Sequence, residues 1–200
     1  MENINRIKYI RNRKDLPDSI VLGKSVGISI NVHIGNNVTI NDNVSIKQGV
    51  MIGDNVIIGK GTTIYENVDI SDNAIIGSCC DIGQNSMILH NVTVGDNVTI
   101  RDSVTIRSNT EIGHYSKISA GTIIGNNNIL HDGAYLGKKT IVANHSVIGR
   151  HAHIYNNTVV GSDVVIGVAV AIGRFSELED KSVVLDGMNI EKYSYIMCTA

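Results

Sequence analysis

Seven histidines are the side chains of this sequence best suited to general acid–base chemistry. An imidazole exchanges its proton near neutral pH, so it can take a proton from a hydroxyl or amine and return it later. His131 is one candidate base, because Asp132 follows it directly. For each histidine the alternative is a solvated turn residue. The other histidines are His33, His90, His114, His145, His151 and His153.

A metal site is not expected. Cys79, Cys80 and Cys198 lack metal-ligand spacing, and the histidines are not grouped in a way that supplies it. An odd number of cysteines without a secretion signal indicates reduced thiols, and we therefore expect a cytoplasmic protein.

Composition and charge set further limits. Two hundred residues with one proline and no linker fit a single domain. A formal net charge of −2 gives no reason to expect nucleic acid or an anionic membrane as a partner. The apolar runs are only a few residues long, too short for a membrane span. These limits leave a small-molecule substrate or a protein partner.

A six-residue repeat must position these candidates. Every sixth residue from Ile4 to Ile196 is Ile, Leu or Val, with no insertion or deletion. If that aliphatic position is i, position i+4 is mostly small or β-branched, i+1 is often glycine, and i+3 is often Asn or Gly. Asn and Gly tolerate left-handed backbone angles, so i+3 is predicted to be a turn.

The motif Ile-Gly-x-Asn-Val-x resembles the hexapeptide-repeat acyltransferase family, closely between Leu22 and Ile172. The resemblance implies an all-β fold, a single left-handed parallel β-helix of about eleven triangular coils with three hexads in each. Positions i and i+4 would point inward. Residues 1–200 would then form one domain, with an irregular N-terminal cap at 1–20 and a C-terminal cap at 185–200.

If a coil contains eighteen residues, residues n and n+18 stack into columns. One column predicts a structural asparagine ladder, whose stacked amides bond one another: Asn37, Asn55, Asn73, Asn91, Asn109 and Asn127. His131 falls in a column of glycines, which would leave room for a ligand against the backbone. Asn128 occupies a normally inward position and predicts an irregular backbone there.

Position i+5 is predicted to face outward, and two of the three faces carry apolar stripes there. Exposed apolar stripes usually mark a partner surface, and the family forms trimers, so we expect a homotrimer. The alternative is that these residues serve only strand propensity. The stripes include Ile123, Ile129, Ile141, Val147, Val159 and Val165.

The resemblance also implies a function, transfer of an acyl group from acetyl-coenzyme A to a hydroxyl or amine of a sugar or nucleotide sugar. In related sugar acyltransferases the catalytic histidine lies at i+2 and an Asp usually follows. His90 has this register, with Asn91 in place of the Asp. Coenzyme A would be held through its phosphates and adenine by a basic corner with one aromatic residue: Lys138, Lys139, Arg174, Phe175 and Lys192.

A non-catalytic scaffold or assembly protein is the competing interpretation. The repeat has no insertion that could project a catalytic loop, and the usual proline-bearing tail of the family is missing. The histidines, the glycine column and the basic corner favour the enzyme instead. We therefore take the acyltransferase as the leading interpretation and the scaffold as the alternative. The sequence does not identify the acyl acceptor.

Overall fold

The computed structural model describes residue 16 and residues 19–198, and this part of the chain forms thirty two-residue strands in three parallel sheets. Sheet A contains β1 (Val21–Leu22), β4 (Thr39–Ile40), β7 (Ile57–Ile58), β10 (Ile75–Ile76), β13 (Thr93–Val94), β16 (Glu111–Ile112), β19 (Ile129–Leu130), β22 (Val147–Ile148), β25 (Val165–Ile166) and β28 (Val183–Val184). Sheet B contains β2 (Gly27–Ile28), β5 (Ser45–Ile46), β8 (Thr63–Ile64), β11 (Asp81–Ile82), β14 (Thr99–Ile100), β17 (Lys117–Ile118), β20 (Tyr135–Leu136), β23 (His153–Ile154), β26 (Ala171–Ile172) and β29 (Asn189–Ile190). Sheet C contains β3 (His33–Ile34), β6 (Met51–Ile52), β9 (Asp69–Ile70), β12 (Met87–Ile88), β15 (Thr105–Ile106), β18 (Ile123–Ile124), β21 (Ile141–Val142), β24 (Val159–Val160), β27 (Glu177–Leu178) and β30 (Tyr195–Ile196).

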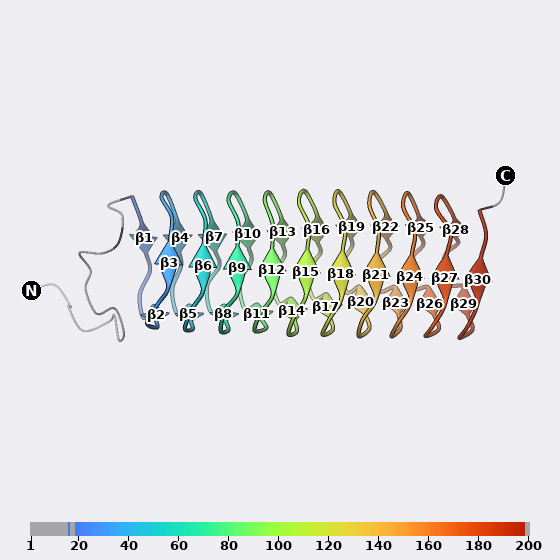
Figure 1. Cartoon of the computed structure of the whole chain (residues 1–200), viewed down its shortest axis with the longest axis horizontal. Coiled ribbons are helices and arrows are strands. Elements are labelled where there is room, and N and C mark those ends of the chain that lie inside the picture. The colour runs from blue at the N-terminus through green and yellow to red at the C-terminus, as the bar shows by residue number, and fades with distance from the viewer. Residues whose placement is uncertain (1–15, 17–18, 199–200) are drawn as a thin grey trace, which may run out of the picture.

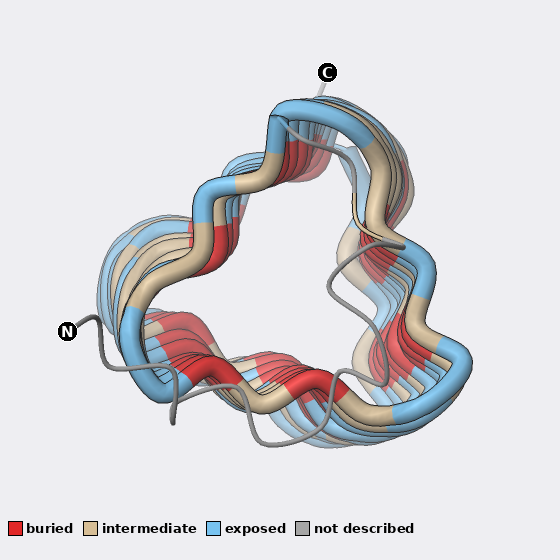
Figure 2. The backbone as a smooth tube through the Cα atoms, turned by 90° about the vertical axis from the view of Figure 1, so that its left-hand side faces the viewer, coloured by how far each residue is buried: buried red, intermediate tan, exposed pale blue. Residues whose placement is uncertain are grey.

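The three sheets are the sides of a triangular prism (Figure 2). Each strand pairs with the strand one coil later, for example Val21 with Thr39, so the coil contains eighteen residues as predicted. In Figure 1 the chain advances from left to right, and it rises along sheet C in front before it passes over the top edge to sheet A. This winding is left-handed, and the predicted fold is confirmed.

The strands make ten coils. The hexads that begin at Ile4 and Ile10, which the sequence assigns to an eleventh coil and a cap, lie outside the described residues. At the other end, residues 185–198 complete the tenth coil, since β29 pairs with β26 and β30 with β27. Their large apolar side chains are exposed, Leu185 by 67% and Tyr193 by 66%, and a capping role for them stays a prediction.

The core is a column of aliphatic side chains inside the prism. Ile58, Ile82 and Ile106, all at position i, have no exposed surface. Burying such a side chain contributes about 1.5–3 kcal/mol relative to exposure. The position before each of them faces outward, so the first residue of every two-residue strand is the more exposed of the pair.

Asparagine supplies the turns at the corners between the sheets. Asn55 and Asn109 have φ angles of 58°, a left-handed conformation that Asn adopts at low cost. At the corner between sheets C and A their amides form the predicted ladder in two runs: the Nδ2 of Asn55 donates to Oδ1 of Asn73 at 3.2 Å, and that of Asn91 to Oδ1 of Asn109 at 3.0 Å. No side-chain hydrogen bond joins Asn73 to Asn91 in the described part of the chain. The ladder continues from Asn127 to Nε2 of His145 at 3.1 Å.

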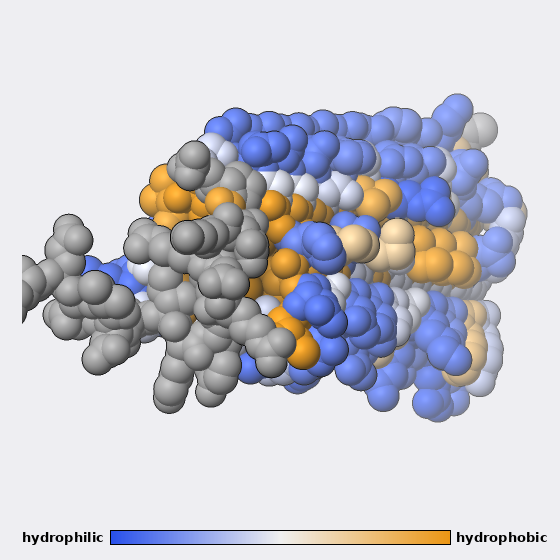
Figure 3. Space-filling view, turned by 60° about the vertical axis from the view of Figure 1, so that its left-hand side comes forward, coloured by the Kyte–Doolittle hydropathy of each residue, from blue (hydrophilic) through white to orange (hydrophobic). Residues whose placement is uncertain are grey.

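Two sheets carry apolar side chains on their outer surfaces. Exposed fractions are 39% for Ile123 and 42% for Ile141 on sheet C, and 38% for Ile129 and 44% for Val165 on sheet A. Figure 3 shows apolar side chains gathered between bands of polar residues. The predicted outward orientation of the stripes is therefore confirmed. No stretch of residue 16 or residues 19–198 forms a helix long and apolar enough to cross a membrane.

Candidate functional site

A groove of about 450 Å³ runs along the outer surface of sheet A, beside the corner between sheets A and B. Gly77, Gly95, Gly113 and His131 line it in succession, one from each coil. The column of glycines that the sequence singled out thus lies along a hollow on the surface. A volume of this size falls within the range of small-molecule sites.

Close stacking of the coils explains why these positions are glycine. A Cβ on Gly95 would lie 2.8 Å from the backbone nitrogen of His114, and a Cβ on Gly113 would lie 2.5 Å from that of Asp132. Both distances are shorter than van der Waals contact. The glycines therefore allow the coils to stack closely, and the groove forms because these residues have no side chains.

His131 interrupts the glycine column, which resumes at Gly149, and it lies at one end of the groove. Its backbone N–H donates to the carbonyl of Ile148 at 2.9 Å, so the main chain stays in the regular ladder. Among residues 19–198, no hydrogen bond or ion pair engages the exposed imidazole. Glu111 on β16 lines the same groove. The ring of His131 can therefore meet a ligand with either nitrogen.

His114 lies in the preceding coil and lines the same groove. Its Nδ1 accepts a hydrogen bond from the backbone N–H of Asp96 at 2.8 Å, and it lies 3.6 Å from Oδ2 of that residue. A neutral imidazole has one donor and one acceptor nitrogen, so the proton of His114 resides on Nε2. His114 therefore presents an N–H donor rather than a base.

The carboxylate of Asp132 is engaged by a main-chain hydrogen bond between coils. Its Oδ1 accepts the backbone N–H of His114 at 2.9 Å, one coil earlier. Other carboxylates at position i+2 do the same, such as Oδ1 of Asp72 with the N–H of Asp54. The described contacts of Asp132 do not include His131, so its catalytic role stays a prediction. Because His114 occupies this same i+2 column, the repeat pattern indicates that its ring is bonded to the preceding coil, but not which of its nitrogens is engaged.

The backbone near Asn128 is regular, and the predicted irregularity is wrong. Asn128 is fully buried, and its strand neighbours on β19 pair normally with β16 and β22. Its Nδ2 donates to the carbonyl of Ala143 at 2.6 Å, and its Oδ1 accepts the N–H of Ser146 at 2.7 Å. An inward amide is tolerated because adjacent coils satisfy both ends of it.

His90 lies at a different corner, between sheets C and A. Its Nδ1 is 3.8 Å from Oδ2 of Asp72, and the imidazole is 57% exposed. Asn91, expected to orient it, instead donates its amide to Asn109 in the ladder. The structure therefore brings His114, His131 and Asp132 together at one corner but keeps His90 and Asn91 apart from them.

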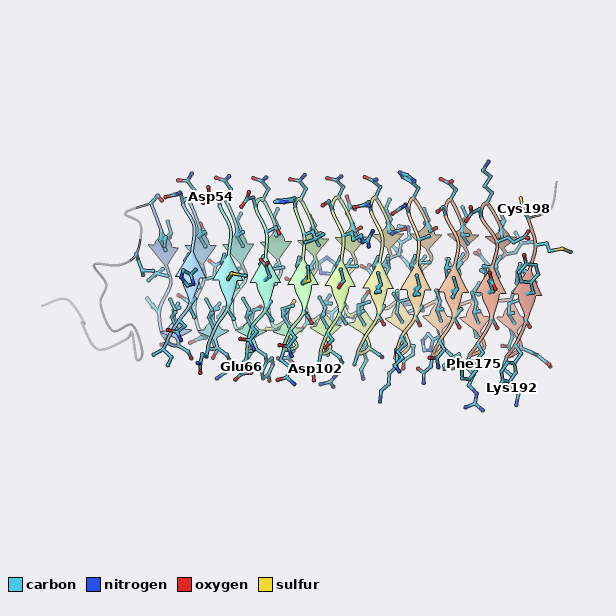
Figure 4. The ribbon with its side chains drawn as sticks, in the orientation of Figure 1. Asp54, Glu66, Asp102, Phe175, Lys192 and Cys198 are labelled. Carbon is cyan, nitrogen blue, oxygen red and sulfur yellow. The ribbon has the colours of Figure 1, made fainter. Side chains whose placement is uncertain are left out.

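The basic residues expected to hold coenzyme A lie at the corner between sheets B and C, towards the C-terminal end. Lys138, Arg174 and Lys192 follow one another along this edge, and Figure 4 labels Lys192 beside Phe175 there. Phe175 stacks on Tyr193, with ring centroids 5.2 Å apart and planes 5° apart. The sequence treated Tyr193 only as part of a cap, because the eighteen-residue column alone does not show which rings meet.

The cysteines and metal donors add no further chemistry. Over residue 16 and residues 19–198, no group of three His, Cys, Asp or Glu side chains could hold a metal ion. Cys79 and Cys80 form no disulfide in the part of the chain that the structure describes. Burial raises the pKa of Cys80 to about 11, so this thiol is unreactive near neutral pH.

The sequence model of the GMPPB C-terminal domain family matches residues 16–110 and 49–148, which together span more than half of the chain. The chain belongs to that family. No curated protein sequence matches this member of the GMPPB C-terminal domain family.

Solved structures with the same fold include acyltransferases. A UDP-N-acetylglucosamine acyltransferase from Campylobacter jejuni is 22% identical with a TM-score of 0.50, over 87% of this chain and 68% of that one. LpxA from Acinetobacter baumannii is 20% identical with a TM-score of 0.54, over 92% of this chain and 70% of that one. These likenesses confirm that this member of the GMPPB C-terminal domain family has the β-helix fold of hexapeptide-repeat acyltransferases.

Proposed function

We propose that the chain transfers an acyl group from a thioester, acetyl-coenzyme A, to a hydroxyl or amine of a sugar or nucleotide sugar. The observation that supports this proposal is the groove in which the unengaged imidazole of His131 and the N–H donor of His114 lie on adjacent coils. Acyl transfer needs these two functions, a base for the acceptor and a donor for the developing oxyanion. Proteins of this fold include acyltransferases that act on UDP-N-acetylglucosamine.

His131 acts as the base in this mechanism. It removes the proton from the acceptor as the acceptor oxygen or nitrogen bonds to the acyl carbon. Nε2–H of His114 donates to the carbonyl oxygen, where negative charge accumulates. The carbon–sulfur bond then breaks, and His131 returns the proton to the thiolate. The Asp96 N–H keeps His114 in the tautomer that donates.

The donor carries phosphates and an adenine, and the basic corner fits them. Lys138, Lys139, Arg174 and Lys192 are exposed cations on one edge. Nζ of Lys192 lies 5.9 Å from the ring centroid of Tyr193, whose stack with Phe175 offers an aromatic face. Sheet B separates this corner from His131, so the donor would lie across that sheet. We place the protein in the cytoplasm, since Cys79 and Cys80 form no disulfide within residues 19–198.

Three copies would assemble through the apolar stripes of sheets A and C. Ile123, Ile141 and Val159 on sheet C and Ile129 and Val165 on sheet A are each exposed by 38–44%. Burying them removes apolar area from water, the main driving force of association. Light scattering on the eluted protein should give three times the chain mass of 21.6 kDa. A monomer at micromolar concentration would contradict the trimer.

The alternative function is a non-catalytic scaffold. It is favoured by the unbroken repeat, which projects no loop over the groove among the described strands. A scaffold has no reason to bind an acyl thioester or its free thiol form, so binding of these compounds distinguishes the two functions.

Binding of coenzyme A and acetyl-coenzyme A, followed by thermal unfolding, tests the proposed function. A ligand at a hundred times its Kd adds about 2.7 kcal/mol, which is roughly 5–10 °C for a chain of this size. Lys138→Ala and Lys192→Ala should remove most of this shift. Lys24→Ala and Lys60→Ala, exposed cations at the corner between sheets A and B, should leave it unchanged. No shift at millimolar ligand would favour the scaffold.

A further inference from the structure

A second groove, of about 330 Å³, lies at the corner between sheets B and C, in the N-terminal half of the prism. It shares no lining residue with the groove of His131. Its volume is at the low end of the range for small-molecule sites, enough for a single ring system with a few substituents. The proposed acyl transfer makes no use of it.

Tyr65 and Arg101 are the two walls of this groove, and Gly83 lies between them as the floor. The three occupy one column, one residue from each coil. Gly83 is buried, and a Cβ there would lie 2.5 Å from the backbone carbon of Arg101, so the floor has no side chain. The gap between the two walls is therefore set by the coil spacing alone.

The gap has the width of one flat ring. Adjacent coils stack about 4.8 Å apart, so the Cα atoms of Tyr65 and Arg101 are about 10 Å apart. A planar ring needs about 3.5–4 Å on each face, or roughly 7–8 Å between the groups that enclose it. One ring fits between the two side chains, and two stacked rings do not.

Both walls are groups that stack on planar π systems. Tyr65 is 40% exposed, and Arg101 is exposed as well. No ion pair or hydrogen bond engages the Arg101 guanidinium within residues 19–198. Aromatic rings and guanidinium planes are the surfaces on which proteins stack nucleobases.

The polar rim of the groove is rich in acceptors. Asp81 on β11 and Asp102 contribute carboxylates, and Gln84 donates its amide to Oδ2 of Asp102 at 3.4 Å. Figure 4 labels Asp102 and Glu66 along this same edge of the prism. Two carboxylates beside one guanidinium disfavour a phosphate inside the groove. They suit N–H donors on a neutral ring, as when a carboxylate accepts from a base amine.

We propose that this groove binds a nucleobase that carries an exocyclic amine. The base stacks between Tyr65 and Arg101, its amine edge meets Asp81 and Asp102, and its sugar and any phosphates lie outside in solvent. This site is separate from the groove of His131, which lies at another corner, and its lining includes none of the cations proposed to hold the acyl donor, which lie further along the same edge towards the C-terminal end.

Titration calorimetry with nucleosides tests the proposal on the full chain. Guanosine is compared with inosine, which lacks the 2-amino group, and cytidine with uridine, which has a carbonyl in place of the amine. We expect the amine-bearing member of each pair to bind at least tenfold more tightly. Absence of saturable binding by any nucleoside at millimolar concentration would overturn the proposal.

Substitutions distinguish the two side chains that stack on the base from the two carboxylates that bond its amine. Tyr65→Ala and Arg101→Ala should each weaken binding of every nucleoside by about tenfold, because stacking is lost. Asp81→Asn and Asp102→Asn should instead reduce the preference for amine-bearing bases. Thermal unfolding of each variant verifies that it is folded.

Tyr155→Ala is the matched control. Tyr155 occupies the same column as Tyr65, five coils further on, and is exposed to a similar extent, 45% against 40%. Its removal should leave nucleoside binding unchanged. Loss of binding in Tyr155→Ala but not in Tyr65→Ala would place the site elsewhere. Displacement of the nucleosides by methyl pyranosides, with no preference for an amine, would assign the groove to sugars and reject the proposal.

Discussion

His131→Ala should lower kcat for acyl transfer by about 10²–10⁴-fold, the usual contribution of a positioned general base. The substitution removes the imidazole but leaves the backbone ladder intact, since the N–H of this residue bonds to the main chain of Ile148. The measurement is acceptor-dependent release of free coenzyme A thiol over a panel of sugars and nucleotide sugars. KM for the donor should change little, because the cations that would hold it lie at another corner.

Three further substitutions make this result specific. His33→Ala removes an exposed histidine on β3, far along the prism, and should have no effect on kcat. His90→Ala decides between the two candidate bases. If its kcat falls by orders of magnitude while His131→Ala stays active, the base is His90 with Asp72, and the groove on sheet A is not the active site. His114→Ala should lose less activity than His131→Ala, because it removes a hydrogen-bond donor rather than the base.

Asn128→Asp should destabilise the fold by about 3–5 kcal/mol at pH 7, the cost of a buried charge without a partner. The amide is fully buried and donates to the carbonyl of Ala143. A carboxylate would place an acceptor against that acceptor, although it could still accept the N–H of Ser146. Urea unfolding, followed by circular dichroism, measures the loss.

The pH dependence of this loss tests its cause. Burial raises the pKa of the introduced carboxyl in the folded state above its unfolded value of about 3.9. Below that unfolded value both states are protonated, and the O–H can donate to Ala143. As pH rises, the unfolded state ionises first, so the destabilisation grows until the folded pKa is passed. A loss that is equal at pH 4 and pH 8 would rule out a buried charge as the cause.

Asn127→Asp is the control, in the same hexad but exposed at the turn. Aspartate tolerates the φ of 57° found there, and it can still accept the amide of Asn109. Its effect should stay within about 0.5 kcal/mol. Equal losses in the two variants would mean that the added negative charge, rather than burial, is responsible.

The repeat predicted the fold because its period determines which residues stack. Ile58 and Ile82 face inward, and Asn55 and Asn73 bond each other, as the eighteen-residue coil requires. Asn128 was misinterpreted, because an inward polar residue suggests disruption until its partners in adjacent coils are known. Those partners, the carbonyl of Ala143 and the N–H of Ser146, are main-chain groups, which a column of side-chain identities does not include.

The candidate site was only partly predictable for the same reason. The glycine column and His131 could be found from the sequence, since they depend on register alone. The tautomer of His114 could not be predicted, because the N–H of Asp96 decides which of its nitrogens carries the proton. The stack of Phe175 on Tyr193 likewise depends on side-chain torsions that no period determines.

The eighteen-residue coil has a consequence for how such a chain can change length. Deleting one whole coil shortens the prism by about 4.8 Å and leaves every downstream side chain on its own face. Deleting a single hexad preserves the core equally well, but it rotates everything downstream by one third of a turn. Tyr135 and His153 would then move from sheet B to sheet A, and the apolar stripe of sheet A would move to sheet C. The outer surfaces of this molecule therefore keep their arrangement only when hexads are inserted or deleted in multiples of three. The core, by contrast, accepts any number of added or removed hexads.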